Sequence, residues 1–426
     1  MPEAIQKLQW ERLTRLLRHA TVQVPYYRDC FGSRRIAVDE IRSTRDFARI
    51  PILSKTALQE HSAALLAETG DTRSRQKNAS GGSTGKPVQF YQDRFYWEYA
   101  RASQWFVESW WGIRPGERTA SIWGCDRDLP LQSWKERLSQ EICQVRTCNA
   151  FAITEQRLED FARMLMTWRP RFVTGYASAL ELFARFLLSR PHLRIRPLAV
   201  KSTAEVLTAE QRSLLETVFA CPVYNFYGSR EVNNLAAECP AHRGLHVNSL
   251  GRYIEIVDEE GAPVPPGVPG RILVTDLTNF AMPFIRYEIE DVGSWAGESC
   301  PCGRPFPLLA EVLGRSSDFI ATPGGKIIHG EYFTHLFYDF PQVSRFQVNQ
   351  TALREIRVDI VLQPGVADFP LDLLRRRIGE VLGPEVNCEV GIVEDIARTA
   401  SGKHRFTISS VSMPWGSQRA SQLPRK

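Results

Sequence analysis

The first part of the chain shows a helical pattern of hydrophobic positions. The Val24-Pro25 step ends this pattern, because a residue that precedes proline avoids the helical conformation. Residues 38–70 then predict short helices on both sides of Pro51. The hydrophobic positions of the N-terminal helix are Ile5, Leu8, Leu13, Leu16, Leu17 and Ala20.

The middle of the chain alternates helices with short strands. Helical patterns cover residues 153–168 and 178–190. The run PVYNFY, residues 222–227, is rich in aromatic and β-branched side chains and predicts a strand that ends at Gly228. A repeated order of helix and strand is typical of a layered α/β fold.

Two helices of this region carry start signals in their sequence. Ser178 and Glu181 have the spacing of a capping box. In this motif the hydroxyl of the first residue accepts a hydrogen bond from the backbone N–H of the second, and the acid or amide side chain of the second accepts one from the backbone N–H of the first. Thr208 and Gln211 have the same spacing ahead of a helix that runs to Phe219. We therefore expect both hydroxyls to cap the helices that follow them.

From residue 246 to residue 320 hydrophobic and polar positions alternate. Turns at EG (260–261) and PPG (265–267) interrupt the alternation and predict a β-meander or a distorted β-barrel. After Gly314 the pattern becomes that of a compact β/α unit. Its predicted elements are a strand at 326–328, a helix at 331–338, strands at 345–349 and 355–362, a helix at 370–382 and a strand at 388–393.

Length and pattern together predict two domains. The chain has 426 residues, which exceeds the size at which a single hydrophobic core stops growing. We expect an α/β fold with a large N-terminal domain, residues 1–313, made of layered α/β subdomains and the distorted barrel. A small α+β C-terminal domain, residues 314–426, would follow and end in a basic tail at 413–426.

Composition excludes several classes of partner. The net charge of +5, from 53 basic and 48 acidic residues, is too small to indicate nucleic-acid binding, and the basic residues form no long run. No apolar run reaches the ~18 residues of a membrane span, and the N-terminus lacks the pattern of a signal peptide. Nine cysteines, odd in number and mostly isolated, are typical of a reducing compartment. We expect a cytoplasmic protein without a membrane partner; a homodimer is only the general expectation.

A glycine-rich stretch, NASGGSTGKPVQFYQD at residues 78–93, is the first candidate for chemistry. Glycines let backbone N–H groups converge on an anion. The spacing is one residue short of a P-loop, and a strand follows it where a P-loop opens a helix. From the residues alone, the stretch is either a phosphate-binding loop between two strands or a plain turn.

Four further motifs each combine a turn with a residue that suits a nucleotide site. YGSRE places Tyr227, Gly228 and Glu231 at a strand end, where a ring could stack on a base and a carboxylate could bind Mg²⁺. In RYEIEDVG, Asp291 could accept hydrogen bonds from both hydroxyls of a ribose. GRSSD (314–318) lies between the predicted domains, and TASGK (399–403) presents a lysine on a glycine turn. Each motif alone is compatible with an ordinary turn.

Taken in this order, the motifs resemble those of the acyl-adenylate-forming superfamily, which includes acyl-CoA synthetases and luciferase. The chain is most similar to the branch of phenylacetate–CoA ligases and CapK-type proteins. The resemblance spans about residues 8–407. Its branch-specific phrases are VPYYRDCFG, DFARIPILSKTAL, YGSREVNNLAAEC, GLHV, VTDLTNFAMPFIRYEIEDVG and CPCGR.

The resemblance implies a role for each motif. Tyr227 and Gly228 would line the adenine site, Glu231 would bind Mg²⁺, and Asp291 would bind the ribose. Arg230 and Glu290 depart from the superfamily pattern, which has threonine and glycine at these positions. The glycine-rich loop, which would hold the β- and γ-phosphates of ATP, consists of Ser80, Gly81, Gly82, Ser83, Thr84, Gly85 and Lys86.

Three residues of the C-terminal part also match the family. Arg315 would contact the nucleotide and act in catalysis with Glu231, Asp318 would be the hinge about which a mobile C-terminal domain turns, and Lys403 would be the catalytic lysine. The resemblance thus implies activation of a carboxylic acid, aryl or a related small acid, by ATP and Mg²⁺, followed by transfer to CoA. Transfer to an acyl carrier protein or an amine, and a non-catalytic nucleotide-binding role in polysaccharide or secondary-metabolite assembly, are the alternatives.

Four cysteine and histidine residues suggest a second, structural site. Cys239 and His242 are separated by two residues, and Cys300 and Cys302 by one, with about 60 residues between the pairs. Four such ligands suit a closed tetrahedral zinc site, and members of the resembling branch carry zinc in this region. His246 competes with His242 as the histidine ligand. Reduced cysteines without a metal are the alternative.

Overall fold

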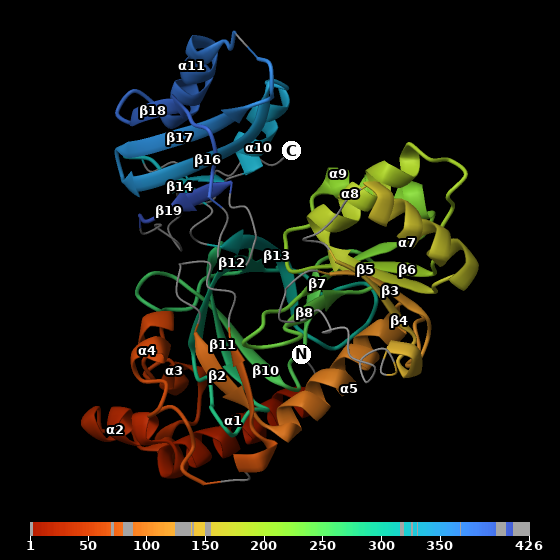
Figure 1. The fold of residues 1–426 in the computed structure, drawn as a ribbon. Helices are drawn as coiled ribbons and strands as arrows, with labels where there is room; N and C mark the ends of the chain where they lie inside the picture. Colours follow the sequence, from red (N-terminus) through yellow and green to blue (C-terminus); the bar gives the residue numbers. More distant parts are fainter. Residues whose placement is uncertain are drawn as a thin grey trace.

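The computed structural model is dominated by one large mixed sheet (Figure 1). In the described part of the chain, a region of helices with a two-stranded sheet precedes the large sheet in sequence, and a unit of helices and strands follows it. The structure describes residues 3–69, 72–79, 88–123, 138, 140–149, 155–315, 319–324, 327–329, 331–366, 368–397 and 406–411.

Among the described residues the large sheet has eleven strands, in the order β10-β11-β12-β13-β9-β8-β7-β6-β5-β3-β4. Its parallel half consists of β3 (Thr119–Trp123), β4 (Val145–Asn149), β5 (Phe172–Tyr176), β6 (Ala199–Thr203) and β7 (Val223–Tyr227). Its antiparallel half consists of β8 (Ala236–Glu238), β9 (Leu245–Val247), β10 (Arg252–Val257), β11 (Gly270–Asp276), β12 (Tyr287–Trp295) and β13 (Leu308–Arg315). The predicted α/β fold and the predicted meander are therefore parts of one sheet.

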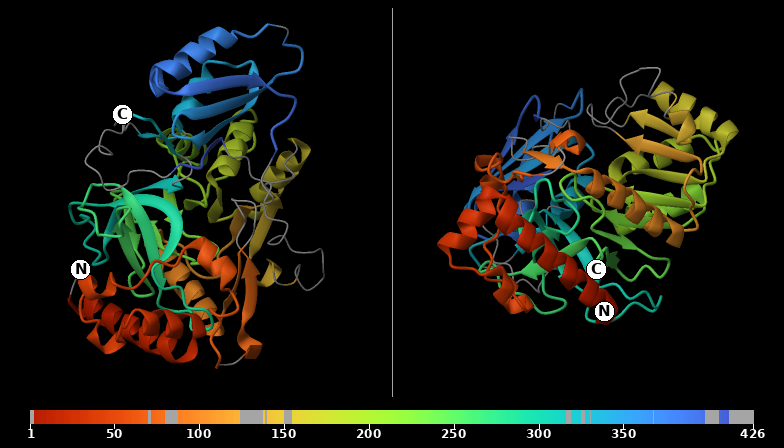
Figure 2. Two further views of the ribbon diagram at one scale, coloured as in Figure 1. Left: turned by 90° about the vertical axis from the view of Figure 1, so that its left-hand side faces the viewer. Right: turned by 90° about the horizontal axis from the view of Figure 1, so that it is seen from below.

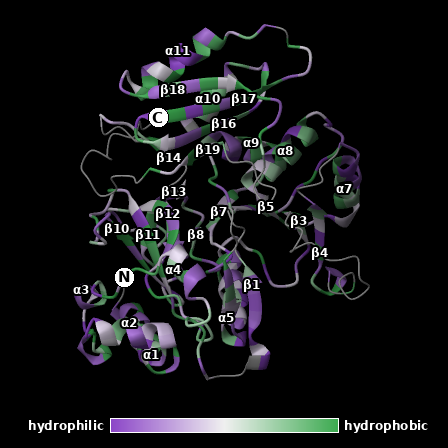
Figure 3. Ribbon diagram, turned by 60° about the vertical axis from the view of Figure 1, so that its left-hand side comes forward, coloured by the Kyte–Doolittle hydropathy of each residue, from purple (hydrophilic) through white to green (hydrophobic). Residues whose placement is uncertain are grey.

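Helices cover both faces of the parallel half of the sheet. Successive residues of a strand point to opposite faces, so neighbouring residues pack against different helices. Val173 and Val200 pack among the hydrophobic residues of α7 (Glu155–Trp168), α8 (Ala177–Leu188) and α9 (Ala209–Phe219). Their neighbours Phe172 and Ala199 pack instead with Val107 of α5 (Arg94–Trp110). Helix α8 is rich in hydrophobic residues, whereas α7 and the N-terminal α1 carry many hydrophilic ones (Figure 3).

The N-terminal segment covers the antiparallel half of the sheet, and Figure 2 shows this arrangement from two sides. Leu13, Phe47 and Phe90 share one buried cluster with Ile254 and Ile272 of the sheet. The elements of this segment are α1 (Glu3–Gln23), α2 (Pro25–Ser33), η1 (Val38–Glu40), α3 (Thr44–Phe47), α4 (Lys55–Glu60), η2 (Thr72–Ser74), β1 (Gln76–Ala79) and β2 (Gln89–Gln92).

The C-terminal part has a sheet and a buried cluster of its own. Its four-stranded sheet has the order β18-β17-β16-β19, and Val348 and Val358 of this sheet pack against Leu374 and Ile378. Strand β13 continues to Arg315, so the proposed domain boundary at 313/314 lies within this strand. The elements are β14 (Phe319–Ala321), β15 (Ile327–His329), α10 (Glu331–Tyr338), β16 (Val343–Ala352), β17 (Glu355–Leu362), α11 (Leu371–Leu382), β18 (Asn387–Ile392) and β19 (Thr407–Ser409).

One of the two predicted capping boxes is confirmed and the other is wrong. Thr208 accepts from the backbone of Gln211, and the Gln211 side chain accepts from the backbone of Thr208. Helix α8 instead begins one residue before Ser178, whose backbone N–H is capped from outside by the carboxylate of Glu205 at 2.8 Å. Tertiary contact therefore replaces the local cap that the spacing predicted.

None of the helices among the described residues combines the length and the apolar character that a membrane span requires.

Candidate functional site

The YGSRE motif lies where strand β7 leaves the large sheet. Tyr227 is the last residue of the strand, and Gly228 begins a turn whose chain returns through Asn234. A Cβ atom on Gly228 would lie 3.0 Å from the Asn234 nitrogen, a separation tighter than most real Cβ contacts. The turn therefore leaves little room for a side chain at Gly228, and it places Glu231 at the carboxyl end of a parallel strand.

Buried polar side chains from other elements hold this turn. The amide nitrogen of Gln92, which is fully buried, donates to the carbonyl oxygens of Arg230 and Glu231 at 3.2 and 3.1 Å. The hydroxyl of Tyr96 accepts from the backbone N–H of Asn233 at 2.9 Å. Sequence reasoning missed Gln92, because a glutamine at the end of a strand carries no motif of its own.

A buried ion pair supports the same turn from the antiparallel half of the sheet. The Arg252 guanidinium donates to the carbonyl of Asn233 at 3.0 Å and to the carboxylate of Asp276 at 2.6 Å. Both side chains of the pair are almost completely removed from solvent. A buried charge that loses its partner is strongly unfavourable, so the pair fixes the position of the backbone that it contacts.

The structure brings two of the predicted nucleotide residues into direct contact. The Tyr227 hydroxyl donates to the Asp291 carboxylate at 2.7 Å, although 64 residues separate them in the chain. The backbone of Arg315 on β13 lies directly opposite Asp291 on β12. Tyr227, Asp291 and the Arg315 backbone thus share one region at the junction of the two halves of the sheet.

The glycine-rich stretch joins two antiparallel strands, as predicted. Strand β1 ends at Ala79, strand β2 begins at Gln89, and the two strands pair directly. The side-chain amide of Asn78 on β1 donates to the Gln92 side chain at 3.1 Å. The loop residues Ser80, Gly81, Gly82, Ser83, Thr84, Gly85 and Lys86, together with Asp318 and Lys403, lie outside the described residues.

A second cluster brings three cysteines and a histidine together beside β9. The ligand atoms of Cys239, His246, Cys300 and Cys302 all lie within 4.8 Å of one another. The Cys239 and Cys300 sulfurs are 3.6 Å apart, and the Cys302 sulfur lies 3.2 Å from Nε2 of His246. Two thiolates on a tetrahedral zinc ion would be about 3.7 Å apart, so the spacing suits such a site.

Of the two histidines that the sequence left open as ligands, His246 is the one that lies beside the three cysteines. His246 belongs to β9 and pairs with Leu308 at the start of β13, directly after the loop of residues 296–307 that carries Cys300 and Cys302 (the Cys300 loop). The His242 ring stacks on Tyr224 with the ring planes 8° apart, and its Nδ1 lies 3.4 Å from the Glu238 carboxylate. His242 is not among the residues whose ligand atoms come together in the cluster.

The protonation of His246 suits a metal ligand. Nδ1 of His246 faces the Phe306 carbonyl at 3.4 Å, and a carbonyl can only accept, so Nε2 is the ring nitrogen left for a ligand bond. Burial lowers the pKa of His246, which favours the neutral ligand form. Burial raises the pKa of the Cys239 thiol to about 12, and hydrogen bonding to the two neighbouring thiols adds to the rise. Metal binding would therefore release a proton here.

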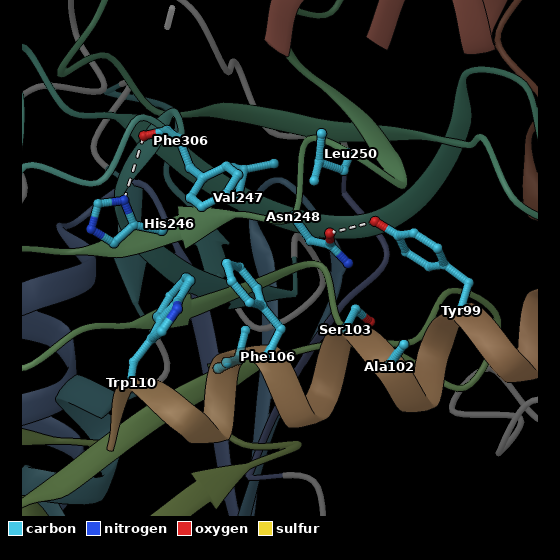
Figure 4. Close-up of a pocket in the computed structure, with 11 residues that line it drawn as sticks. Tyr99, Ala102, Ser103, Phe106, Trp110, His246, Val247, Asn248, Leu250 and Phe306 are labelled. Carbon is cyan, nitrogen blue, oxygen red and sulfur yellow. Dashed lines mark hydrogen bonds between the residues drawn. The ribbon is translucent and has the colours of Figure 1, made fainter. Parts of the chain in front are cut away.

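An apolar pocket of about 190 Å³ adjoins the cluster (Figure 4). Tyr99, Phe106 and Trp110 line it from α5, with Trp110 nearest His246 and Tyr99 at the other end, where its hydroxyl donates to Asn248 at 2.9 Å. None of the predicted nucleotide residues that the structure describes lines this pocket. It is therefore separate from the Tyr227–Asp291 region.

Sequence comparisons relate the chain to two kinds of protein. The phenylacetate–coenzyme A ligase of Thermus thermophilus is 28% identical over 337 residues, which is 76% of this chain and 73% of that protein. Protein CapK of Staphylococcus aureus is 23% identical over 349 residues, which is 79% of this chain and 74% of that protein. The family model of the CapK C-terminal domain matches residues 320–410.

Structural comparison establishes the fold over nearly the whole chain. A 2-hydroxyisobutyryl-CoA ligase in complex with R3-HIB-AMP superposes with a TM-score of 0.72 at 21% identity. The superposition covers 96% of this chain and 90% of that ligase. The large sheet and the C-terminal unit therefore have the architecture predicted from the motifs.

Proposed function

Because the chain belongs to the acyl-adenylate-forming superfamily, in the branch of phenylacetate–coenzyme A ligases and CapK, we propose that it is an AMP-forming acid–thiol ligase. The enzyme activates a carboxylic acid with ATP and transfers the acyl group to coenzyme A. The contact between Tyr227 and Asp291, next to the turn that carries Glu231, is the observation that supports this proposal most directly. Activity would take place in the cytoplasm.

The nucleotide would lie along the junction of the two sheet halves. Tyr227 and Gly228 line the adenine side, and Asp291 accepts hydrogen bonds from the ribose hydroxyls. A carboxylate has about four lone-pair sites, so it can keep the bond from Tyr227 and still accept from a ribose. Arg315 contacts the nucleotide from β13, and residues Ser80 to Lys86 hold the β- and γ-phosphates.

The chemical task of the residues is to neutralise charge while two anions approach. A carboxylate is a poor electrophile, and transfer of AMP to it forms a mixed anhydride that a thiol can attack. Lys403 bridges the carboxylate and the α-phosphate and so offsets their repulsion. Glu231 would hold Mg²⁺, and the ion would supply positive charge to the departing pyrophosphate. Rotation about Asp318 then removes Lys403 and opens the path for the thiol.

We further propose that Cys239, His246, Cys300 and Cys302 hold a structural Zn²⁺. This assignment is supported by the cysteine and imidazole ligands and by the Cys239–Cys300 sulfur separation, which is close to that of two ligands on a tetrahedral ion. The hydrogen bond from His246 to the Phe306 carbonyl supports it as well. Four protein ligands leave no open position for substrate, so the ion would stabilise the packing of β9 against the Cys300 loop.

The experiment that tests the function is ATP–pyrophosphate exchange with pooled aryl, alkyl and amino acids. We expect exchange that depends on the acid, and dividing the pool then identifies the substrate. Product assays with coenzyme A, a carrier protein and simple amines identify the acceptor. Folded protein that binds ATP but supports no exchange with any pool would instead indicate the non-catalytic nucleotide-binding role.

Asp291→Asn is expected to weaken ATP binding about tenfold, because hydrogen bonds to a charged group contribute roughly 1.5–3 kcal/mol and one acceptor charge is lost. Calorimetric titration with ATP and Mg²⁺ measures the change in Kd. The same substitution at the exposed Asp29 on α2 is the matched control and should leave Kd unchanged. Equal Kd values for parent and Asp291→Asn would remove Asp291 from the nucleotide site.

A further inference from the structure

Glu290, which directly precedes Asp291, has a left-handed backbone conformation with φ of +67°. Residues with a side chain rarely adopt this conformation, because the Cβ atom approaches the following carbonyl oxygen. Glycine adopts it without this penalty. A glutamate at this position must therefore be held by contacts elsewhere in the structure.

The strained residue lies in a bulge of strand β12. Glu288 and Val292 pair with Leu273 and Arg271 of β11, so residues 289–291 face the single residue Ile272. A bulge bends a strand and changes the direction of the side chains within it. The conformation at residue 290 therefore sets the direction in which the Asp291 carboxylate leaves the sheet, toward the Tyr227 hydroxyl.

Lys55 contacts Glu290 from the N-terminal segment. Its Nζ atom lies 3.0 Å from the Glu290 carboxylate, and 10% of the lysine side chain and 30% of the glutamate side chain are exposed. An ion pair so far removed from solvent is screened less by salt than a surface pair. Loss of the lysine would leave a carboxylate that is largely covered and has lost this cation.

The backbone around Lys55 is fixed on both sides. Lys55 is the first residue of α4, whose N-cap Ser54 accepts from the backbone of Ala57 at 3.1 Å. Just before it, Leu53 pairs with the start of β12, donating to Arg286 and accepting from Glu288, each at 3.0 Å. The lysine is therefore presented to the bulge from a segment that is itself attached to β12.

We propose that Lys55 is a positioning residue for nucleotide binding. Its ion pair with Glu290 holds the left-handed bulge that aims Asp291 at the ribose. This inference rests on the proposed nucleotide-binding role of Asp291. This positioning role differs from a direct role of Lys55, in which the lysine charge would attract the phosphates of ATP.

Two substitutions at position 290 test the backbone argument. Glu290→Ala removes the ion pair but keeps a side chain in the left-handed conformation, whereas Glu290→Gly removes both the ion pair and the steric penalty. We expect Glu290→Ala to raise the Kd for ATP about tenfold. Without the ion pair, nothing in this pair offsets the cost of the left-handed conformation when ATP binds, and that cost corresponds to roughly a factor of ten. Glu290→Gly should stay within about threefold of the parent. Equal Kd values for the two variants would overturn the proposal.

Substitutions at position 55 test the role of the lysine. Lys55→Met should weaken ATP binding about as much as Glu290→Ala, and the double variant Lys55→Met with Glu290→Gly should recover to within about threefold of the parent. If Lys55 acts on the phosphates directly, the double variant stays as weak as Lys55→Met, and the proposal is wrong. Lys7→Met, at an exposed position on α1, removes the same charge as the control.

A comparison of two nucleotides separates positioning of Asp291 from general structural damage. 2′,3′-Dideoxy-ATP lacks both ribose hydroxyls, so its affinity should not depend on where Asp291 points. Lys55→Met should therefore weaken ATP binding but leave dideoxy-ATP binding within about twofold, and weakening of both nucleotides alike would contradict the proposal. If the parent protein itself does not prefer ATP to dideoxy-ATP, the ribose role of Asp291 fails first, and the proposed function is then the part in error.

Discussion

Glu231→Ala is expected to reduce acid-dependent ATP–pyrophosphate exchange by about 100-fold or more. The carboxylate is the proposed protein ligand of Mg²⁺, and a bound metal ion contributes several kcal/mol to the stabilisation of transferring phosphates. Each ~1.4 kcal/mol corresponds to a factor of ten in rate. The backbone of Glu231 is held by Gln92, and the substitution leaves that hydrogen bond in place. The loss should therefore appear in activity with little change in the unfolding temperature.

The design of this experiment separates metal binding from folding. Exchange is measured over a range of Mg²⁺ concentrations for the parent, for Glu231→Ala and for Glu231→Asp, which keeps a carboxylate on a shorter side chain. Glu231→Asp should recover part of the activity at high Mg²⁺. Glu260→Gln, at an exposed turn, is the control for loss of a negative charge. An unchanged rate and an unchanged Mg²⁺ dependence in Glu231→Ala would exclude Glu231 as the metal ligand.

The sequence predicted a helix or strand best where local signals mark both of its ends. The strands and helices of the C-terminal unit are confirmed from β15 to β18, because turns and alternating hydrophobic positions mark both of their ends. Strands β14 and β19, of three residues each, were not predicted. Helix α5 was missed although Asp93 caps it by accepting from the backbone of Tyr96, a signal that the sequence does contain.

Long-range arrangement could not be read from the same signals. The order of the eleven described strands joins segments far apart in the chain, and no local pattern records which strand ends adjoin. Tyr227 and Asp291 were each predicted from their own turns, but their contact follows only from the packing of β7 near β12. Lys55 and Gln92 belong to residue types that are common on surfaces, so their buried roles emerge only from tertiary structure.

The choice between the two histidines shows the same limit at the scale of one residue. His242 and His246 both follow Cys239 at distances that occur in zinc sites. Pairing of β9 with β13 places His246 against the Cys300 loop, while stacking on Tyr224 places His242 outside the cluster. Spacing therefore identifies the three cysteines, and sheet register selects the histidine.

This assignment leads to the second large effect, on metal content and stability. We expect about one zinc ion per chain in the purified protein, lost in His246→Ala and in Cys300→Ser and retained in His242→Ala. Zinc binding to cysteine and imidazole ligands that only the folded chain brings together contributes folding energy, up to ~10–16 kcal/mol in small zinc domains. In a chain of this size most of the core persists without the ion, so we expect a loss of several kcal/mol. That loss corresponds to a fall of roughly 5–10 °C in unfolding temperature.

Metal analysis and thermal unfolding together decide whether the cluster is a metal site. Cys143→Ser, at an exposed cysteine outside the cluster, controls for the loss of a thiol and should change neither quantity. Treatment of the parent with a strong chelator should reproduce the unfolding temperature of Cys300→Ser, and added zinc should restore it. Since the cluster is separate from the Tyr227–Asp291 region, ATP affinity below the unfolding temperature should remain near that of the parent. If zinc is retained in His246→Ala but lost in His242→Ala, His242 is the ligand. If the parent contains no metal and Cys300→Ser leaves its stability unchanged, the four side chains form an ordinary buried cluster.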